Sequence, residues 1–189
     1  MTQQLAERTS PRTARKAAVL LAIGAVFLIG VLVVAFNRDT QDAQSPLLSR
    51  PAPEITSTTY DDGQFVLSRR KGSWVVLNFF NSTCVPCKRE HPELVKFAEG
   101  QRAMGSRGAE LYTIVNDDSE EAVRSFFAEF GGGWPIIRDD DARIAVDYGI
   151  AKVPETWLIS PTGVVAQRFT GQVTAELLGS AIAAMSGSE

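Results

Sequence analysis

The sequence predicts an α/β domain, in which helices cover both faces of a mixed β-sheet, preceded by one membrane-spanning helix. From residue 51 onward, apolar runs of strand length alternate with segments of helical period in the order β-α-β-α-β-α-β-β-α. Before that point, residues 17–36 form an unbroken, almost wholly apolar run without a charge. The length of 189 residues leaves room for one ordinary domain and a tail.

The run at 17–36 has the length of a membrane anchor, because twenty residues of helix span about 30 Å. A cleaved signal peptide is the alternative, but its apolar region is shorter, about 7–15 residues, and ends in a small-x-small site that residues 34–36 do not supply. We therefore expect an uncleaved, single-pass anchor in the cell membrane. Basic residues precede it, so residues 1–16 should stay cytoplasmic: Arg8, Arg12, Arg15 and Lys16.

The remainder divides into a linker and a domain on the far side of the membrane. Residues 37–50 are polar and lack periodicity, which predicts a linker, and residues 51–189 form the domain. The first 36 residues carry a net charge of +3, and the remainder carries −6. An acidic domain argues against nucleic acid as a partner.

The first half of the domain is predicted from a turn signal, two apolar runs and a helix start. Residues 61–63, Asp-Asp-Gly, mark a turn, and a short strand follows at 65–67. The nearly continuous apolar run at 74–80 predicts a buried central strand. A helix then begins at Cys84 and continues to about Ala98, and Pro92 is expected to kink it.

The second half begins with a strand at 109–115 and a helix whose start, Asp118 with Glu121, resembles a capping box. Apolar side chains at helical spacing form one face of that helix before three glycines end it: Val123, Phe126, Phe127 and Phe130. Further elements are predicted as a strand at 135–137, a helix at 142–148, and strands at 156–159 and 164–169 joined as a hairpin. A closing amphipathic helix carries Leu177, Leu178, Ala181, Ile182 and Met185.

The two cysteines of the chain, Cys84 and Cys87, are spaced as CxxC directly after the predicted central strand. If Cys84 starts a helix, its sulfur feels the exposed N–H groups and the positive end of the helix dipole, which stabilise a thiolate. One helical turn separates the sulfurs, so they can close a small reducible ring. This context is typical of a redox motif, and an exported pair would stay oxidised unless a donor reduces it.

Other uses of a CxxC fit the sequence less well. A structural zinc site needs four cysteine or histidine ligands, but there is no second CxxC and His91 is the sole histidine. Haem attachment needs CxxCH, and Lys88 follows Cys87. A purely structural disulfide at this spacing would add little stability, because so tight a loop removes little entropy from the unfolded chain.

Two segments together resemble the thioredoxin superfamily, and within it the membrane-anchored thiol–disulfide reductases of cytochrome c biogenesis, the DsbE/ResA/TlpA-like group. These segments are Cys84–Pro92, CVPCKREHP, and Tyr148–Gly163, YGIAKVPETWLISPTG. The resemblance covers roughly residues 51–185 and implies a thioredoxin-like fold. It departs from the family at Thr83, where a tryptophan usually precedes the first cysteine.

The resemblance implies roles for individual residues. Cys84 matches the exposed nucleophile, Cys87 the resolving thiol that pairs with it in a disulfide, and Glu90 a carboxylate near the thiols. Pro154 matches the family's cis-proline, and Val153 before it would offer its backbone to an extended substrate chain. Glu155 matches an acidic residue of the cytochrome c branch and is expected at the rim of the substrate groove.

For some of these residues a non-functional interpretation is also open. Glu90 could be a solvated helix carboxylate and Glu155 an exposed loop acid, whereas Lys88 and Arg89 are expected to be surface charges. His91 is expected to be an exposed helix residue rather than a proton shuttle.

We expect thiol–disulfide exchange that needs no cofactor and no metal. The predicted substrates are protein disulfides, with the CxxCH disulfide of apocytochrome c implied by the resemblance, and the electron donor is expected to be a membrane thiol–disulfide carrier. Two alternatives stay open: a thiol oxidase that forms disulfides with the same residues, and a non-enzymatic chaperone that holds copper(I) on two thiolates.

Overall fold

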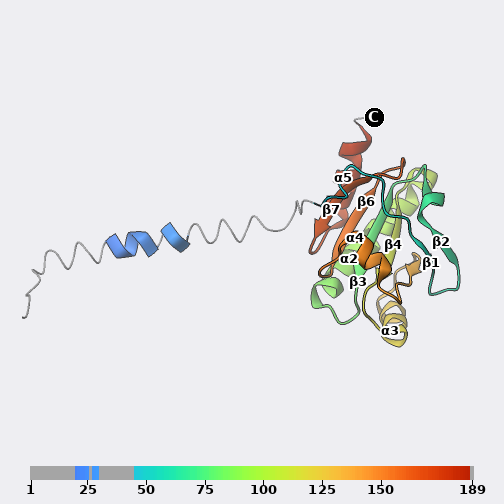
Figure 1. Cartoon of the computed structure of the whole chain (residues 1–189), viewed down its shortest axis with the longest axis horizontal. Helices are drawn as coiled ribbons and strands as arrows, with labels where there is room; N and C mark the ends of the chain where they lie inside the picture. Colours follow the sequence, from blue (N-terminus) through green and yellow to red (C-terminus); the bar gives the residue numbers. More distant parts are fainter. Residues whose placement is uncertain (1–19, 26, 30–44, 188–189) are drawn as a thin grey trace, which may run out of the picture. The chain divides into compact units, whose positions relative to one another are not determined.

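A computed structural model describes residues 20–25, 27–29 and 45–187 (Figure 1). The predicted segment 1–16, the greater part of the predicted anchor at 17–36 and the linker residues 37–44 lie outside the described residues. Residues 20–25 and 27–29 are helical. Among the described residues, no helix is both long and apolar enough to cross a bilayer.

The domain is built on a five-stranded mixed sheet with the order β5-β4-β3-β6-β7. The central strand β3 runs parallel to β4 on one side and antiparallel to β6 on the other. All six residues of β3 are buried, as its apolar run predicts. The strands are β3 (Val75–Phe80), β4 (Glu110–Val115), β5 (Ile136–Ile137), β6 (Glu155–Ile159) and β7 (Val165–Thr170).

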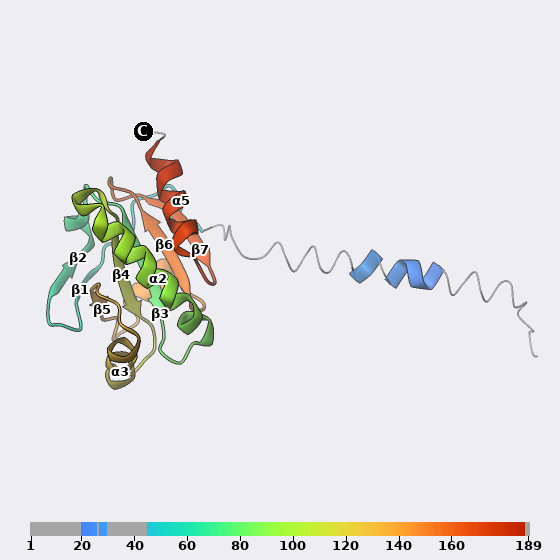
Figure 2. The ribbon, with the colours of Figure 1, turned by 180° about the vertical axis from the view of Figure 1, so that it is seen from behind.

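Helices cover both faces of this sheet, which confirms the predicted α/β architecture. Helix α2 (Val85–Ala103) and helix α5 (Ala175–Ser186) lie side by side over one face (Figure 2). Their side chains Leu94, Phe97 and Leu178 pack there against residues of the strands. The short helix α4 (Arg143–Tyr148) packs on the other face beside an antiparallel hairpin of β1 (Thr56–Thr58) and β2 (Gln64–Val66). Helix α3 (Glu120–Phe130) follows β4, and short 3-10 helices lie at Leu67–Arg70 and Gly105–Arg107.

Two local expectations need correction, and one strand was missed. Helix α2 contains Pro92 and ends at Ala103, beyond the expected end near Ala98. Helix α3 is capped by Ser119, whose hydroxyl accepts the backbone N–H of Ala122, and not by Asp118. The strand β1 was not predicted, because its three residues are polar and have no apolar alternation.

The domain also begins earlier than the predicted linker allows. Leu47 and Leu48, which we assigned to the linker, pack against the core cluster to which α4 contributes Tyr148. The backbone then follows β7: the N–H of Ser49 donates to Val165, and the N–H of Val165 donates to Arg50. Residues 45–50 therefore belong to the fold. Two leucines in a polar stretch were the signal that indicated this.

Candidate active site

The cysteines lie where the central strand meets the helix that covers it. Cys84 is the N-cap residue of α2, and its sulfur accepts the backbone N–H of Cys87 at 3.2 Å. Pro86 occupies the first turn, where a missing N–H leaves no broken bond. Cys84 and Cys87 form a disulfide, as expected. Cys87 is buried against Phe80 and Phe126, whereas Cys84 is partly exposed, so Cys84 is the sulfur that a partner protein can reach.

A polar loop holds the chain in front of Cys84. The Asn81 amide donates to the backbone carbonyls of Asn116 and Asp117, at 3.0 and 2.7 Å, and its oxygen accepts the N–H of Thr83 at 2.8 Å. The Asp118 carboxylate accepts the N–H of Ser82. These bonds tie the loop to the end of β4. Thr83 is exposed and presents a small polar side chain next to Cys84.

The segment before β6 lies against the disulfide, as the family resemblance implies. The Val153–Pro154 peptide bond is cis. The carbonyl oxygen of Val153 lies 3.6 Å from the Cys84 sulfur, and the Val153 side chain packs against the cluster that contains Cys87. Residues separated by about seventy positions in sequence thus form one surface, with the backbone of Val153 next to the reachable sulfur.

Glu90 lies in the interior behind this surface and is not a solvated helix carboxylate. It is only 2% exposed, one turn beyond Cys87 on α2. Its Oε1 accepts a hydrogen bond from the Asn78 amide at 2.8 Å, and among the described residues its buried Oε2 completes none. Burial raises the pKa of Glu90 to about 8, although the backbone of Val173 and the Asn78 amide favour the charged form. A group with this pKa can exchange a proton near neutral pH.

Glu155 does not lie at the rim of a substrate groove, and that expectation is wrong. It is 1% exposed, and both of its oxygens accept hydrogen bonds from the Arg168 guanidinium at 2.8 Å. Oε1 also accepts the indole N–H of Trp157 at 2.8 Å. Glu155 begins β6, and alternation along that strand places it on the same face as Trp157, opposite Thr156, which meets Asn78 on the α2 side.

His91 is likewise not the exposed residue that was expected. It is buried, its ring stands edge-on to Phe126 and Phe127, and its Nε2 lies 2.9 Å from the carbonyl oxygen of Gly131. Burial lowers the pKa of His91, which favours the neutral ring. Lys88 and Arg89 are exposed, as expected.

Two site residues were missed by the sequence reasoning. Asn78 and Thr156 are buried and bonded to each other at 3.1 Å between Glu90 and the segment that contains Pro154. The available signal was a polar residue inside an otherwise apolar buried strand, which needs hydrogen-bond partners.

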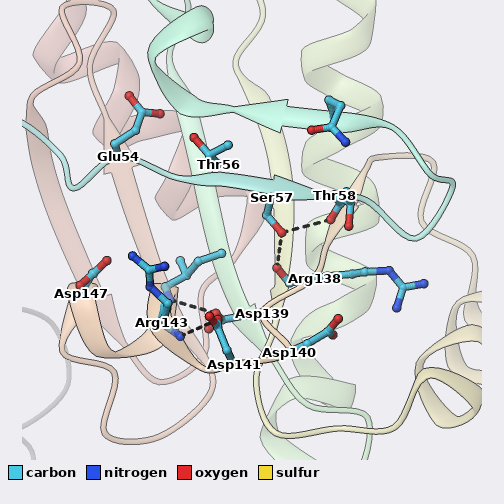
Figure 3. Close-up of a pocket in the computed structure, with 12 residues that line it drawn as sticks. Glu54, Thr56, Ser57, Thr58, Arg138, Asp139, Asp140, Asp141, Arg143 and Asp147 are labelled. Carbon is cyan, nitrogen blue, oxygen red and sulfur yellow. Dashed lines mark hydrogen bonds between the residues drawn. The ribbon is translucent and has the colours of Figure 1, made fainter.

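A separate cavity of about 860 Å³ lies between β1 and the start of α4 (Figure 3). Acidic side chains line it, but the Asp139 carboxylate there already accepts the backbone N–H groups of Ile144 and Ala145. Within the described part of the chain, no group of three or more histidine, cysteine, aspartate or glutamate side chains is placed to hold a metal ion.

Comparisons with known proteins agree with this geometry. Residues 48–168 match the model of the AhpC/TSA family. The thiol-disulfide oxidoreductase ResA of Bacillus subtilis (strain 168) is 31% identical over 127 residues, which cover 67% of this chain and 69% of ResA. The thiol:disulfide interchange protein DsbE of Pseudomonas fluorescens biotype C is 28% identical over 156 residues, 82% of each chain.

Solved structures show the same fold. The thioredoxin domain of a thiol-disulfide oxidoreductase from Bacteroides vulgatus superimposes with a TM-score of 0.64 at 22% identity, and the match covers 75% of this chain and 99% of that domain. StoA from Bacillus subtilis gives a TM-score of 0.60 at 23% identity, covering 72% of this chain and 99% of StoA. The expected thioredoxin-like fold is thereby confirmed.

Proposed function

This chain belongs to the AhpC/TSA family and is a thiol–disulfide oxidoreductase of the ResA and DsbE type, and we propose that it acts as a reductase of disulfides in exported proteins. The observation that carries the proposal is the pairing of a partly exposed Cys84 sulfur, 3.6 Å from the Val153 carbonyl, with a buried Cys87 and a buried Glu90 behind it. Disulfide reduction needs an accessible nucleophile, a shielded resolving thiol and an internal proton acceptor.

In the reduced protein, the Cys84 thiolate attacks one sulfur of the substrate disulfide and expels the other as a thiolate. The N–H of Cys87 and the start of α2 stabilise the Cys84 thiolate before the attack. Cys87 then gives its proton to Glu90 and attacks the Cys84 sulfur of the mixed disulfide. The second substrate thiolate leaves, and the Cys84–Cys87 disulfide forms. Two electrons pass from the cysteine pair to the substrate.

We propose that the substrate approaches as an extended chain along Val153, whose backbone groups can pair with it with little demand on sequence. The CxxCH disulfide of apocytochrome c is the proposed natural substrate. Because an exported CxxC would otherwise remain oxidised, a membrane thiol–disulfide carrier is proposed as the electron donor. Residues 17–36 are proposed to anchor the protein in the cell membrane with the domain on the extracytoplasmic side.

The direction of electron flow is tested by the reduction potential of the Cys84–Cys87 pair. A value near the ~−270 mV of thioredoxin supports a reductase, and a value near the ~−120 mV of DsbA supports an oxidase instead. Copper(I) bound tightly enough to block disulfide exchange would favour the chaperone alternative.

The division of labour between the thiols is tested by trapping. Cys87→Ser should accumulate mixed disulfides with substrate proteins, because the intermediate formed by Cys84 is no longer resolved. Cys84→Ser should accumulate none, which non-reducing electrophoresis and mass spectrometry can establish. Trapping by Cys84→Ser alone would reverse the assignment of nucleophile and resolving thiol.

A further inference from the structure

Asn78 is a polar residue in the middle of the buried strand β3, where an unpaired amide would be costly. Its Nδ2 donates to Glu90 Oε1 at 2.8 Å and to Thr156 Oγ1 at 3.1 Å. One amide nitrogen thus joins three elements, α2, β3 and β6. Both of its N–H groups are used, so the two oxygens that it contacts must act as acceptors.

The two acceptors belong to the two sides of the active site. Glu90 lies one turn beyond Cys87 on α2. Thr156 is two residues beyond Pro154, in the strand that follows the segment beside the Cys84 sulfur. The Asn78 amide is therefore a direct connection between the carboxyl behind the resolving thiol and the strand that carries the substrate-facing backbone.

The bond also distinguishes the two oxygens of Glu90. Because Oε1 accepts from Asn78, a proton on the carboxyl resides on Oε2. Oε2 is buried and completes no hydrogen bond among the described residues, and the backbone of Val173 also acts on the carboxyl and favours its charged form. We propose that Asn78 is a positioning residue that holds Glu90 by Oε1, leaves Oε2 to exchange a proton with the Cys87 thiol, and couples this exchange to β6 through Thr156.

This proposal rests on the proposed function, and its proton step completes that reaction. The Cys87 S–H bond breaks, its proton goes to Glu90 Oε2, and the Cys87 electron pair forms the new bond to Cys84 as the substrate thiolate leaves. Asn78 itself is neither oxidised nor protonated. It fixes which oxygen receives the proton.

The surroundings of Glu90 leave few other groups to control its titration. β3 and β6 present the uncharged Asn78 and Thr156, and the segment before α5 presents the backbone of Val173. On α2, the Cys87 thiol lies one turn before Glu90, His91 is directed toward Gly131, and the exposed Lys88 and Arg89 precede it. The Glu93 carboxylate accepts the backbone N–H of Ala175 at the start of α5.

The experiment follows the titration of Glu90 by carbon-13 NMR of its carboxyl in the full-length, disulfide-bonded protein. Asn78→Leu removes the donor to Oε1, and loss of one hydrogen bond to a charged group should move the midpoint upward by roughly one to two pH units. Thr156→Val frees the amide from its second anchor and should move the midpoint in the same direction by less. Thr156→Ser keeps the hydroxyl and should restore the wild-type midpoint.

Thr113→Val is the matched control, because Thr113 is also a buried strand threonine and lies beside Asn78 in register on β4, but its hydroxyl accepts the indole N–H of Trp134 and not the Asn78 amide, which donates to Glu90 and Thr156. It should leave the midpoint of Glu90 unchanged. In the reduced protein, the pH profile for resolution of a mixed disulfide should move upward with the NMR midpoint in Asn78→Leu and Thr156→Val.

An unchanged midpoint in folded Thr156→Val, or an equal displacement in Thr113→Val, would overturn the coupling. If Asn78→Leu does not fold, the comparison of Thr156→Val with Thr156→Ser still decides the question. The NMR titration needs no turnover, so a failure of the reductase function is seen separately, as a wild-type protein that reduces no disulfide.

Discussion

The ion pair between Glu155 and Arg168 should contribute strongly to stability, because both charges lose most of their contact with water. The Glu155 side chain is 1% exposed and the Arg168 side chain 15%. Removing one partner of a buried pair leaves an uncompensated charge and costs about 3–5 kcal/mol. Within that range, removing Arg168 and removing Glu155 should cost different free energies, because the exposed fractions of the two side chains differ.

Arg168→Met should cost about 5 kcal/mol of unfolding free energy. It leaves the Glu155 carboxylate buried with only the indole N–H of Trp157 as a donor, and it removes the guanidinium that lies 5.1 Å from the centre of the Trp157 ring. Glu155→Gln should cost about 3 kcal/mol, because the amide still accepts one hydrogen bond and Arg168 retains some access to solvent. The double variant should lose less than the sum of the two.

Urea unfolding of the oxidised protein at neutral pH measures these differences. Glu120→Gln is the control, because Glu120 pairs with Arg124 and Arg138 but its side chain is 49% exposed, so removing its charge should cost far less than either change at the buried pair. If Arg168→Met destabilises the protein no more than Glu120→Gln does, the buried pair does not have the energetic role that its geometry indicates.

Two further predictions concern Glu90 and the N-terminal segment. Because the pKa of Glu90 is raised to about 8 in the fold and is ordinarily near 4.5, the wild-type protein should lose stability as the pH rises through that window, and Glu90→Gln should flatten the loss when unfolding is measured at a series of pH values; an identical pH dependence in both proteins would contradict the burial of this carboxyl. Mass spectrometry of the membrane fraction should find residues 1–36 still attached, and a main species that begins after Phe36 would show cleavage instead.

The sequence predicted the reacting atoms better than their surroundings. Cys84 and Cys87 were placed correctly because a strand followed by CxxC at a helix start fixes local geometry. The position of Pro154 beside them followed from the family resemblance and not from periodicity. Glu90 was placed near the thiols by the family resemblance, but its burial depends on β3 and on the backbone of Val173, which lie outside its own helix.

The errors at Glu155 and His91 have physical causes. Taken as a loop residue, Glu155 was expected in water, but β6 begins at that residue and period-two alternation turns it toward Trp157. His91 lies three residues before the buried Leu94 on the same helix face, a spacing that indicated the interior. In both cases we inferred exposure from the polar residue type, although the spacing of the neighbouring apolar residues indicated burial. The partners that make burial tolerable, Arg168 and the Gly131 carbonyl, could not be paired from sequence alone.

The pairing of residues 49–52 with β7 has a consequence for self-association. The N–H of Ala52 donates to Gly163, and Pro51 lies opposite Val164, so this segment occupies the outer hydrogen-bonding edge of the sheet. Thr58 and Tyr60 bond to the backbone around β5 and protect the opposite edge in the same way. The stretches that these bonds cover, at residues 163–165 and 136–138, are not available as a template on which another copy could add a strand. Residues 49–52, which resemble a linker in sequence, therefore cover the start of β7, and a shortened chain that begins at residue 53 would leave the backbone groups of Gly163 and Val165 without these partners.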